Sequence, residues 1–141
     1  MASKTDELIA GLNVDLANEY AAVIQYRTYA SAVTGPYRQE LRAFFSTEIA
    51  DELGHAGLIA DKIVALGGTP VMHAAEVKMA TDPEEMLKLA LQAEEATIER
   101  YLKRREQAEA AGEAGLVVDL DDVIADESKH RDELRLMLRQ R

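Results

Sequence analysis

The sequence predicts an all-α fold, a four-helix bundle with one long crossover between the second and third helices. Ala, Leu, Glu, Lys and Arg dominate the composition, and these residues favour helices. Four long segments carry apolar residues at steps of three and four, the spacing of one helix face. Breaks rich in glycine and proline separate them. The length of 141 residues suits a single domain over residues 1–141.

The four expected helices follow from the apolar stripes and from the signals that bound them. The break "TGP" ends the first stripe, and we expect Pro36 in the first turn of the second helix. Asp82 before Pro83, with Glu85 following, is a start signal for the third helix. The stripes cover, in order, residues 8–33, 41–66, 87–101 and 116–137.

The connections predict the topology. The first and third are a few residues long, so each joins antiparallel neighbours. The middle one, residues 67–82, spans roughly 50 Å when extended, whereas a helix of thirty residues is about 45 Å long. This connection can therefore run the length of the bundle and start the third helix at the opposite end.

A repeat crosses the whole chain. The segment "IADELGH" at residues 49–55 returns as "IADESKH" at residues 124–130. We call the difference in residue number between positions 49 and 124 the repeat offset. The same offset relates polar residues in all four stripes. It maps Glu19, Tyr26, Asp51, Glu52 and His55 onto Glu94, Tyr101, Asp126, Glu127 and His130. The chain therefore consists of two copies of a helical hairpin, and a pseudo-twofold axis between them would bring their polar groups together at mid-bundle.

These polar residues predict a metal centre. Four glutamates inside an apolar core must be protonated or neutralised, and no Lys or Arg shares their level in the stripes. Two divalent cations would neutralise them, and two neutral imidazoles would complete the ligand set. Carboxylate oxygens with one imidazole per ion favour iron or manganese, while a structural metal such as zinc stays open. The expected ligands are Glu19, Glu52, His55, Glu94, Glu127 and His130.

Five further residues are expected around the ligands. Asp51 and Asp126 could each accept the second ring N–H of the histidine of the other copy. Tyr26 and Tyr101 could hydrogen-bond a ligand carboxylate across the bundle. Glu48 has three interpretations, because its counterpart is Val123: an extra ligand, an iron relay, or a glutamate at the stripe edge that reaches solvent.

Composition and charge exclude several function classes. The chain has no cysteine, which excludes disulfides, zinc–thiolate sites, iron–sulfur clusters and thiol catalysis within it. The formal net charge of −10 disfavours nucleic acid. No signal peptide and no run of eighteen apolar residues is present, so we expect a cytoplasmic protein without a membrane partner. His73 is expected at the surface, Glu95 off the stripe, and a basic cluster on a solvated face or subunit contact: Arg100, Lys103, Arg104 and Arg105.

The ligand set, together with "ALGGTP" and "TDPEEML" around the crossover, resembles the bacterioferritin and Dps-like branch of the ferritin-like di-iron carboxylate superfamily. The resemblance implies a ferroxidase of the iron storage or detoxification type, which oxidises Fe(II) with O2 or H2O2 at a di-iron site within one subunit of a homo-oligomer. It implies two iron ions as cofactors. Glu52 and Glu127 would bridge them, and Glu19 and Glu94 would be terminal ligands.

Three departures from the family pattern bear on this expectation. Bacterioferritins bind haem through a methionine where this chain has Leu53, so no haem is expected. The chain ends eleven residues after His130, without a fifth helix, so a dimer, a 12-mer and a 24-mer shell are all open. Rubrerythrins carry a further glutamate where this chain has Thr97. The alternatives are a rubrerythrin-like peroxide reductase and a non-enzymatic metal-binding bundle.

Overall fold

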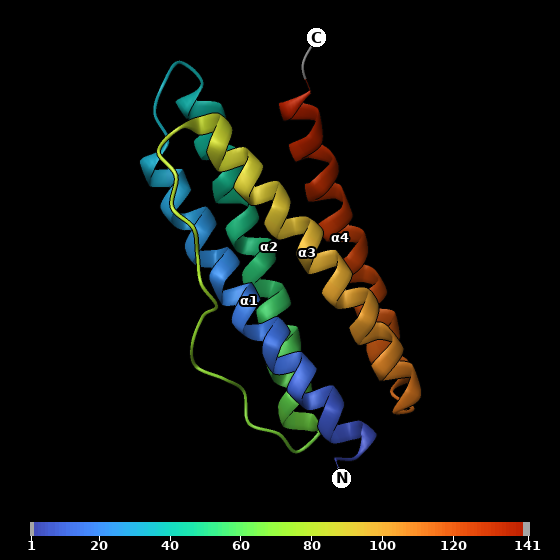
Figure 1. Cartoon of the computed structure of the whole chain (residues 1–141). Coiled ribbons are helices and arrows are strands. Elements are labelled where there is room, and N and C mark those ends of the chain that lie inside the picture. The colour runs from blue at the N-terminus through green and yellow to red at the C-terminus, as the bar shows by residue number, and fades with distance from the viewer. Residues whose placement is uncertain (1, 140–141) are drawn as a thin grey trace.

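The computed structural model describes residues 2–139, and in that range it consists of four α-helices without a strand. The expected all-α bundle is confirmed (Figure 1). None of these helices combines the length and the apolar character needed to cross a membrane. The helices are α1 (Lys4–Ala32), α2 (Arg38–Ala65), α3 (Pro83–Ala110) and α4 (Ala114–Leu138).

The helices form two antiparallel hairpins, α1–α2 and α3–α4, which pack side by side (Figure 1). Contacts between the hairpins join α1 to α3 and α2 to α4, so α1 and α4 lie on one diagonal of the bundle. A pseudo-twofold axis that exchanges the hairpins therefore crosses the bundle from the interface between α1 and α3 to the interface between α2 and α4.

The crossover between α2 and α3 runs along α1 to the opposite end of the bundle (Figure 1). Two positions of α1 hold it. The Asn13 side chain donates to the Thr69 carbonyl at 3.1 Å and accepts from the Val71 N–H at 2.9 Å. Further along, the Ala75 N–H donates to the Ala17 carbonyl at 2.9 Å. These bonds satisfy crossover backbone groups that a regular helix or sheet would otherwise pair.

The expected helix start is found at α3, whereas α2 begins later than expected. Asp82 caps α3 by accepting the Glu85 N–H at 3.0 Å, and Pro83 is the first helical residue, as expected. The expectation that Pro36 opens α2 is wrong, because the chain is still turning there and the helix begins at Arg38.

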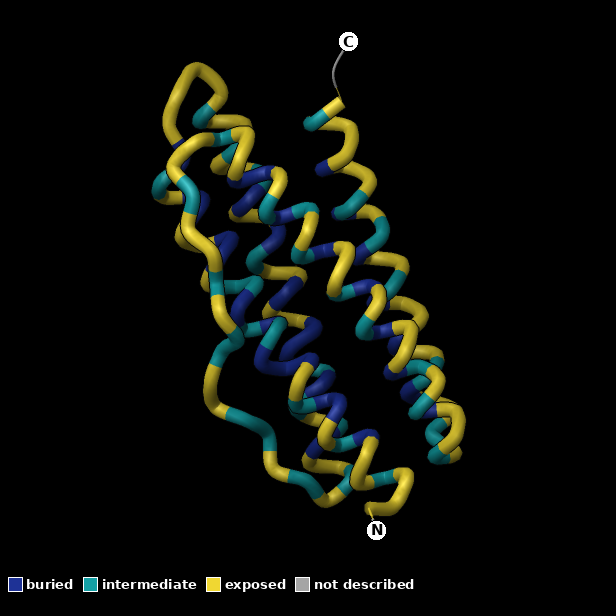
Figure 2. The backbone as a smooth tube through the Cα atoms, in the orientation of Figure 1, coloured by how far each residue is buried: buried dark blue, intermediate teal, exposed yellow. Residues whose placement is uncertain are grey.

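The core consists of two apolar clusters with a polar layer between them. Buried residues follow the inner side of each helix (Figure 2). One cluster lies toward the end that holds the N-terminus: Leu8, Leu12, Leu16, Ala56, Ile59, Ile63, Tyr101, Ala108, Leu116, Leu120 and Val123. The other lies toward the opposite end: Tyr26, Tyr29, Ala30, Val33, Phe45, Met86, Leu87, Ala90 and Leu134. On every helix the expected ligands, and on α2 also Glu48, fall between the residues of the two clusters.

A buried ion pair joins α1 to α3 beside this layer. Arg104 Nε donates to Asp15 Oδ2 at 2.7 Å, and Arg104 Nη2 donates to Asp15 Oδ1 at 3.2 Å. Asp15 is 1 % exposed and Arg104 is 5 % exposed, so the expectation that Arg104 lies on a solvated face is wrong. The repeat relates Arg104 to Tyr29, which is also buried. Both residues lie three positions after an inward-facing tyrosine and continue the inner face of the helix.

Two glycines provide a matched test of this ion pair. A Cβ at Gly11 would lie 1.8 Å from Arg104 Nη1, whereas a Cβ at Gly57 would meet nothing within 4 Å. We expect Gly11→Ala to displace the guanidinium and to lower the free energy of unfolding by up to about 3–5 kcal/mol. Gly57→Ala should raise it by about 0.5–1 kcal/mol, because alanine is the better helix former. Urea unfolding measures both, and equal effects of the two changes would contradict the role of Gly11.

Candidate metal centre

The structure brings the six expected ligand residues together at mid-bundle. Each hairpin supplies one glutamate from its first helix and a glutamate and a histidine from its second helix. A glutamate and a histidine three residues apart share one face of a helix, which is why both side chains point inward. Every one of the six is buried, with at most 7 % of its surface exposed: Glu19, Glu52, His55, Glu94, Glu127 and His130.

The ligand atoms form two neighbouring groups, and within each group they lie within 4.8 Å of one another. The group around His55 consists of Glu19, Glu52, His55 and Glu127, and the group around His130 consists of Glu48, Glu52, Glu94 and His130. Glu52 faces both histidines, with Oε2 at 3.9 Å from His55 Nδ1 and Oε1 at 3.4 Å from His130 Nδ1. Glu127 Oε1 lies 2.9 Å from His55 Nδ1 and 3.8 Å from His130 Nδ1. These two carboxylates therefore occupy the space between the groups.

Each histidine is oriented by an aspartate of the other hairpin. His55 Nε2 lies 3.2 Å from Asp126 Oδ2, and His130 Nε2 lies 3.0 Å from Asp51 Oδ2. These are the crossed pairs that the sequence analysis anticipated. An aspartate accepts only from an N–H, so these contacts assign the ring proton of each neutral imidazole to Nε2. The lone pair of Nδ1 then points into the cluster.

The inward-facing atoms lack hydrogen-bond partners. Within residues 2–139, seven buried side-chain atoms have none, and all seven belong to this cluster: Glu19 Oε2, Glu48 Oε2, Glu52 Oε1, His55 Nδ1, Glu94 Oε2, Glu127 Oε1 and His130 Nδ1. A neutral Nδ1 and a carboxylate oxygen are both acceptors, so they repel one another unless a proton or a metal cation lies between them. In spite of burial, Glu48, Glu52 and Glu94 raise the pKa of His130 above its usual range. Converging oxygen and nitrogen atoms without hydrogen-bond partners could serve as metal ligands, and the residues present fit one or two divalent cations.

Two tyrosines hold the remaining glutamate oxygens. The Tyr26 hydroxyl donates to Glu94 Oε1 at 2.6 Å, and the Tyr101 hydroxyl donates to Glu19 Oε1 at 2.5 Å. Both bonds cross from one hairpin to the other. Each leaves the second oxygen of its glutamate free to face the cluster.

Burial and the repulsion between neighbouring carboxylates shift the pKa values of the glutamates in the cluster. Burial, with the neighbouring Glu52, raises the pKa of Glu19 well above its usual range. Burial also raises the pKa of Glu52 to about 7. The pKa of Glu94 is lowered in spite of burial, because its interactions with Glu127, His130 and the Tyr26 hydroxyl favour the charged carboxylate. Carboxylates with raised pKa values bind protons more readily, and a cation that binds the cluster would displace these protons into solvent.

Burial distinguishes the remaining candidates, Glu48, Glu95 and His73. Glu48 is 5 % exposed and Oε2 lies 2.7 Å from His130 Nδ1, which removes the interpretation as a stripe-edge residue that reaches solvent. Glu95 is exposed and pairs with Arg135 at 3.0 Å, and His73 is exposed. Asp15 and its partner Arg104 are the buried charged residues near the cluster that sequence reasoning missed. The position of Arg104 in the repeat, opposite Tyr29, was the signal that could have found them.

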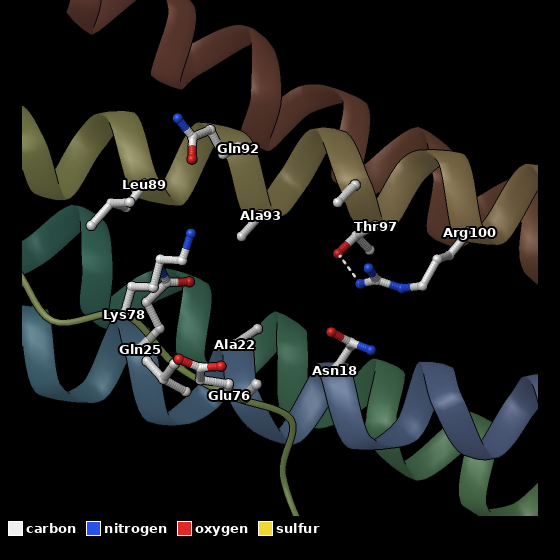
Figure 3. A pocket seen from close by; sticks show the side chains of 13 residues that line it. Asn18, Ala22, Gln25, Glu76, Lys78, Leu89, Gln92, Ala93, Thr97 and Arg100 are labelled. Carbon is white, nitrogen blue, oxygen red and sulfur yellow. Dashed lines mark hydrogen bonds between the residues drawn. The ribbon is translucent and has the colours of Figure 1, made fainter.

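A pocket of about 230 Å³ opens between α1, α3 and the crossover (Figure 3). Arg100 Nη2 donates to Thr97 Oγ1 at 2.8 Å on one of its walls. The repeat offset pairs lining positions of α1 with lining positions of α3: Asn18 with Ala93, Ala21 with Ala96, Ala22 with Thr97, and Gln25 with Arg100. The pocket therefore lies on the pseudo-twofold axis that relates the two ligand groups. It is on the α1–α3 face, opposite the aspartates of α2 and α4.

Comparisons with known proteins agree with this arrangement. The family model of the ferritin-like domain matches residues 9–141. A solved ferritin-like, diiron-carboxylate protein from Bacillus anthracis str. Ames is 51 % identical, with a TM-score of 0.96 over 99 % of this chain and 100 % of that one.

The names of two more distant relatives mention an oligomeric assembly and a binding partner. The bacterioferritin-related protein of Bacteroides fragilis, described as a dodecameric thioferritin, is 27 % identical, with a TM-score of 0.83 over 93 % of this chain and 83 % of that one. A "nutrient stress-induced DNA-binding protein" of Nostoc sp. is 28 % identical over 80 % of this chain and 67 % of its own length.

The tyrosine bonds can be tested in the metal-free protein. We expect Tyr101→Phe to lower the free energy of unfolding by about 1–3 kcal/mol, because it removes the hydroxyl that donates a hydrogen bond to Glu19 inside the core. Tyr37→Phe is the matched control, since Tyr37 is 70 % exposed, and it should change stability by less than about 0.5 kcal/mol. Urea denaturation measures both, and a Tyr101→Phe protein as stable as the control would count against the bond.

Proposed function

Because the chain belongs to the ferritin-like domain family, we propose that it is a ferroxidase of the iron storage or detoxification type. Fe(II) is the substrate, O2 or H2O2 is the oxidant, and the reaction takes place at a two-iron site within one subunit. The observation that carries the proposal is the convergence of seven unpaired acceptor atoms in a buried layer between two apolar clusters.

The ligand chemistry suits iron. Carboxylate oxygens and one imidazole nitrogen per position favour Fe(II) or Mn(II), and Zn(II) would also bind. We assign Glu19, Glu52, His55, Glu94, Glu127 and His130 as the ligands. Glu52 and Glu127 would be shared by the two positions, because each of them approaches both histidines.

Redox balance requires two ions per turnover. Each Fe(II) gives up one electron, and O2 with two electrons and two protons becomes H2O2. With H2O2 as oxidant, two electrons and two protons give two molecules of water. A pair of iron positions a few ångströms apart therefore matches the two-electron step, whereas a single position would leave a one-electron product.

The residues around the ligands have distinct roles in this proposal. Tyr26 and Tyr101 fix one oxygen of Glu94 and Glu19, so that the other oxygen faces the ions. Asp51 and Asp126 hold the imidazoles in the tautomer that binds metal through Nδ1. The apolar clusters above and below exclude water, which strengthens each charge interaction within the layer.

Partners follow from family and charge. We propose a homo-oligomer, as the dodecameric description of the relative from Bacteroides fragilis suggests. We expect no nucleic-acid partner, in spite of the name of the relative from Nostoc, because this chain has a formal net charge of −10. The alternatives remain a peroxide reductase that takes electrons from an external donor and a metal-binding bundle without activity.

Iron stoichiometry tests the proposal. When Fe(II) is added to the metal-free protein and air or H2O2 follows, we expect rapid oxidation of about two irons per chain and then slower uptake of more. Glu94→Ala and Glu127→Ala should slow the rapid phase by more than about 100-fold. Glu95→Ala is the matched control, because Glu95 neighbours Glu94 but is exposed, and its rapid phase should persist.

Two outcomes would change the conclusion. Uptake that stops at two irons would remove storage and leave the peroxide reductase or the inactive bundle. Rapid oxidation that survives in Glu94→Ala and Glu127→Ala would contradict the site itself.

Metal linkage gives a second, independent test. Co(II) at about 100 times its Kd should stabilise the protein by about 2.7 kcal/mol and raise Tm by about 5–10 °C. Glu127→Gln should lose most of this rise, while its metal-free form should be at least as stable as the parent, because one buried charge is gone. Differential scanning calorimetry measures both, and identical melting with and without Co(II) would speak against a buried carboxylate site.

A further inference from the structure

The two ligand groups differ at one position. The repeat offset pairs all six proposed ligands, both tyrosines and both aspartates, but it pairs Glu48 with Val123. Glu48 is 5 % exposed and Val123 is 3 % exposed, so both side chains are buried at equivalent places in the bundle. One hairpin therefore contributes a carboxylate where the other contributes hydrocarbon.

The Glu48 carboxylate points at the proposed metal position beside His130. Its Oε2 lies 2.7 Å from His130 Nδ1, and neither atom has a hydrogen-bond partner. His130 Nδ1 also lies 3.4 Å from Glu52 Oε1 and 3.6 Å from Glu94 Oε1. Three carboxylates and one imidazole thus converge there, and Glu48 belongs to this group alone.

We propose that the two metal positions are inequivalent: Glu48 is an additional ligand at the His130 position, which takes up the first divalent cation and holds it more tightly. The inference rests on the proposed metal centre and adds the order in which it fills. The cation at the His55 position is the second to bind and the first to leave.

The charges of the two positions give the reason. Glu52 belongs to both ligand groups, whereas Glu127 belongs to the His55 group and also approaches His130, with Oε1 2.9 Å from His55 Nδ1 and 3.8 Å from His130 Nδ1. Each group as found holds three carboxylates and one histidine. With Glu52 and Glu127 shared by both ions, as proposed above, the His130 position has two carboxylates of its own, Glu48 and Glu94, and the His55 position has one, Glu19. Additional carboxylate ligands strengthen the binding of a hard divalent cation, so we expect the two dissociation constants to differ by at least about tenfold.

Arg104 does not change this comparison. It lies on α3 beside the Glu19 side of the layer, but its guanidinium is paired with Asp15 in two hydrogen bonds. Arg100 Nε also lies 4.0 Å from Asp15 Oδ1, so these three residues carry one net positive charge, which disfavours a cation on the Glu19 side and acts in the same direction as Glu48.

A titration of the metal-free chain with Co(II) tests the proposal without any turnover. Calorimetry and the visible absorption of bound Co(II) are followed together under anaerobic conditions. We expect two steps of about one ion per chain, with Kd values at least about tenfold apart. Glu48→Val, which copies the counterpart Val123, should weaken the tight step and bring the two Kd values within about threefold. Glu48→Gln, which keeps the volume, should do the same if packing is not the cause.

Control variants identify the steps. Glu99→Gln removes one carboxylate from the exposed face of α3 and should leave both steps unchanged, which excludes an effect of net charge alone. His130→Ala should abolish the tight step, and His55→Ala should abolish the weak one. Circular dichroism and melting curves establish that each variant is folded before it is titrated.

The outcomes are distinct. Two equal steps in the parent chain, a separation that persists in both Glu48 variants, or loss of the tight step in His55→Ala would each overturn the inequivalence and leave the metal centre intact. A chain that binds no Co(II) at all would overturn the proposed function together with this inference.

Discussion

The cost of burying negative charge governs this molecule. Five glutamates lie inside the bundle, and in the part of the chain that the structure describes their ion pairs involve only two histidines. Carboxylates desolvated in this way take up protons or cations, and the raised pKa values of Glu19 and Glu127 express the first alternative. The tyrosines and aspartates around the cluster hold these side chains in place by hydrogen bonds. A bound cation would offset the repulsion between the carboxylates.

Much of the centre follows from the sequence, because two regularities act on the same residues. Helical periodicity assigns a residue to a face, and the repeat offset assigns each face to a symmetry partner. Together they predict that Tyr26 and Tyr101 reach glutamates across the bundle, and that Asp51 lies beside His130 and Asp126 beside His55. The crossover length supplies the remaining information, since only a connection that spans the bundle brings the two halves into this relation.

The features that escaped prediction occur only once in the chain. Arg104 looks solvated in a run of basic residues, and its burial depends on an aspartate and a glycine of α1, Asp15 and Gly11, which are far away in the sequence. The destination of the Glu48 side chain depends in the same way on His130 of the other hairpin. Tyr37, whose backbone is not helical, delays the start of α2 past Pro36. Periodicity describes one helix at a time and carries no information about such partners.

The correspondence between the hairpins also concerns the evolutionary origin of the chain. A single hairpin carrying Glu19, Glu52 and His55 could have built the same centre as a homodimer, with both halves identical by necessity. Duplication and fusion into one chain remove that necessity. Glu48 opposite Val123, and Asp15 with Arg104 opposite Ala90 with Tyr29, are differences that a homodimer of identical hairpins cannot have. Fusion would have let selection act on each half of the centre separately, in a way that is closed to any strictly symmetric ancestor.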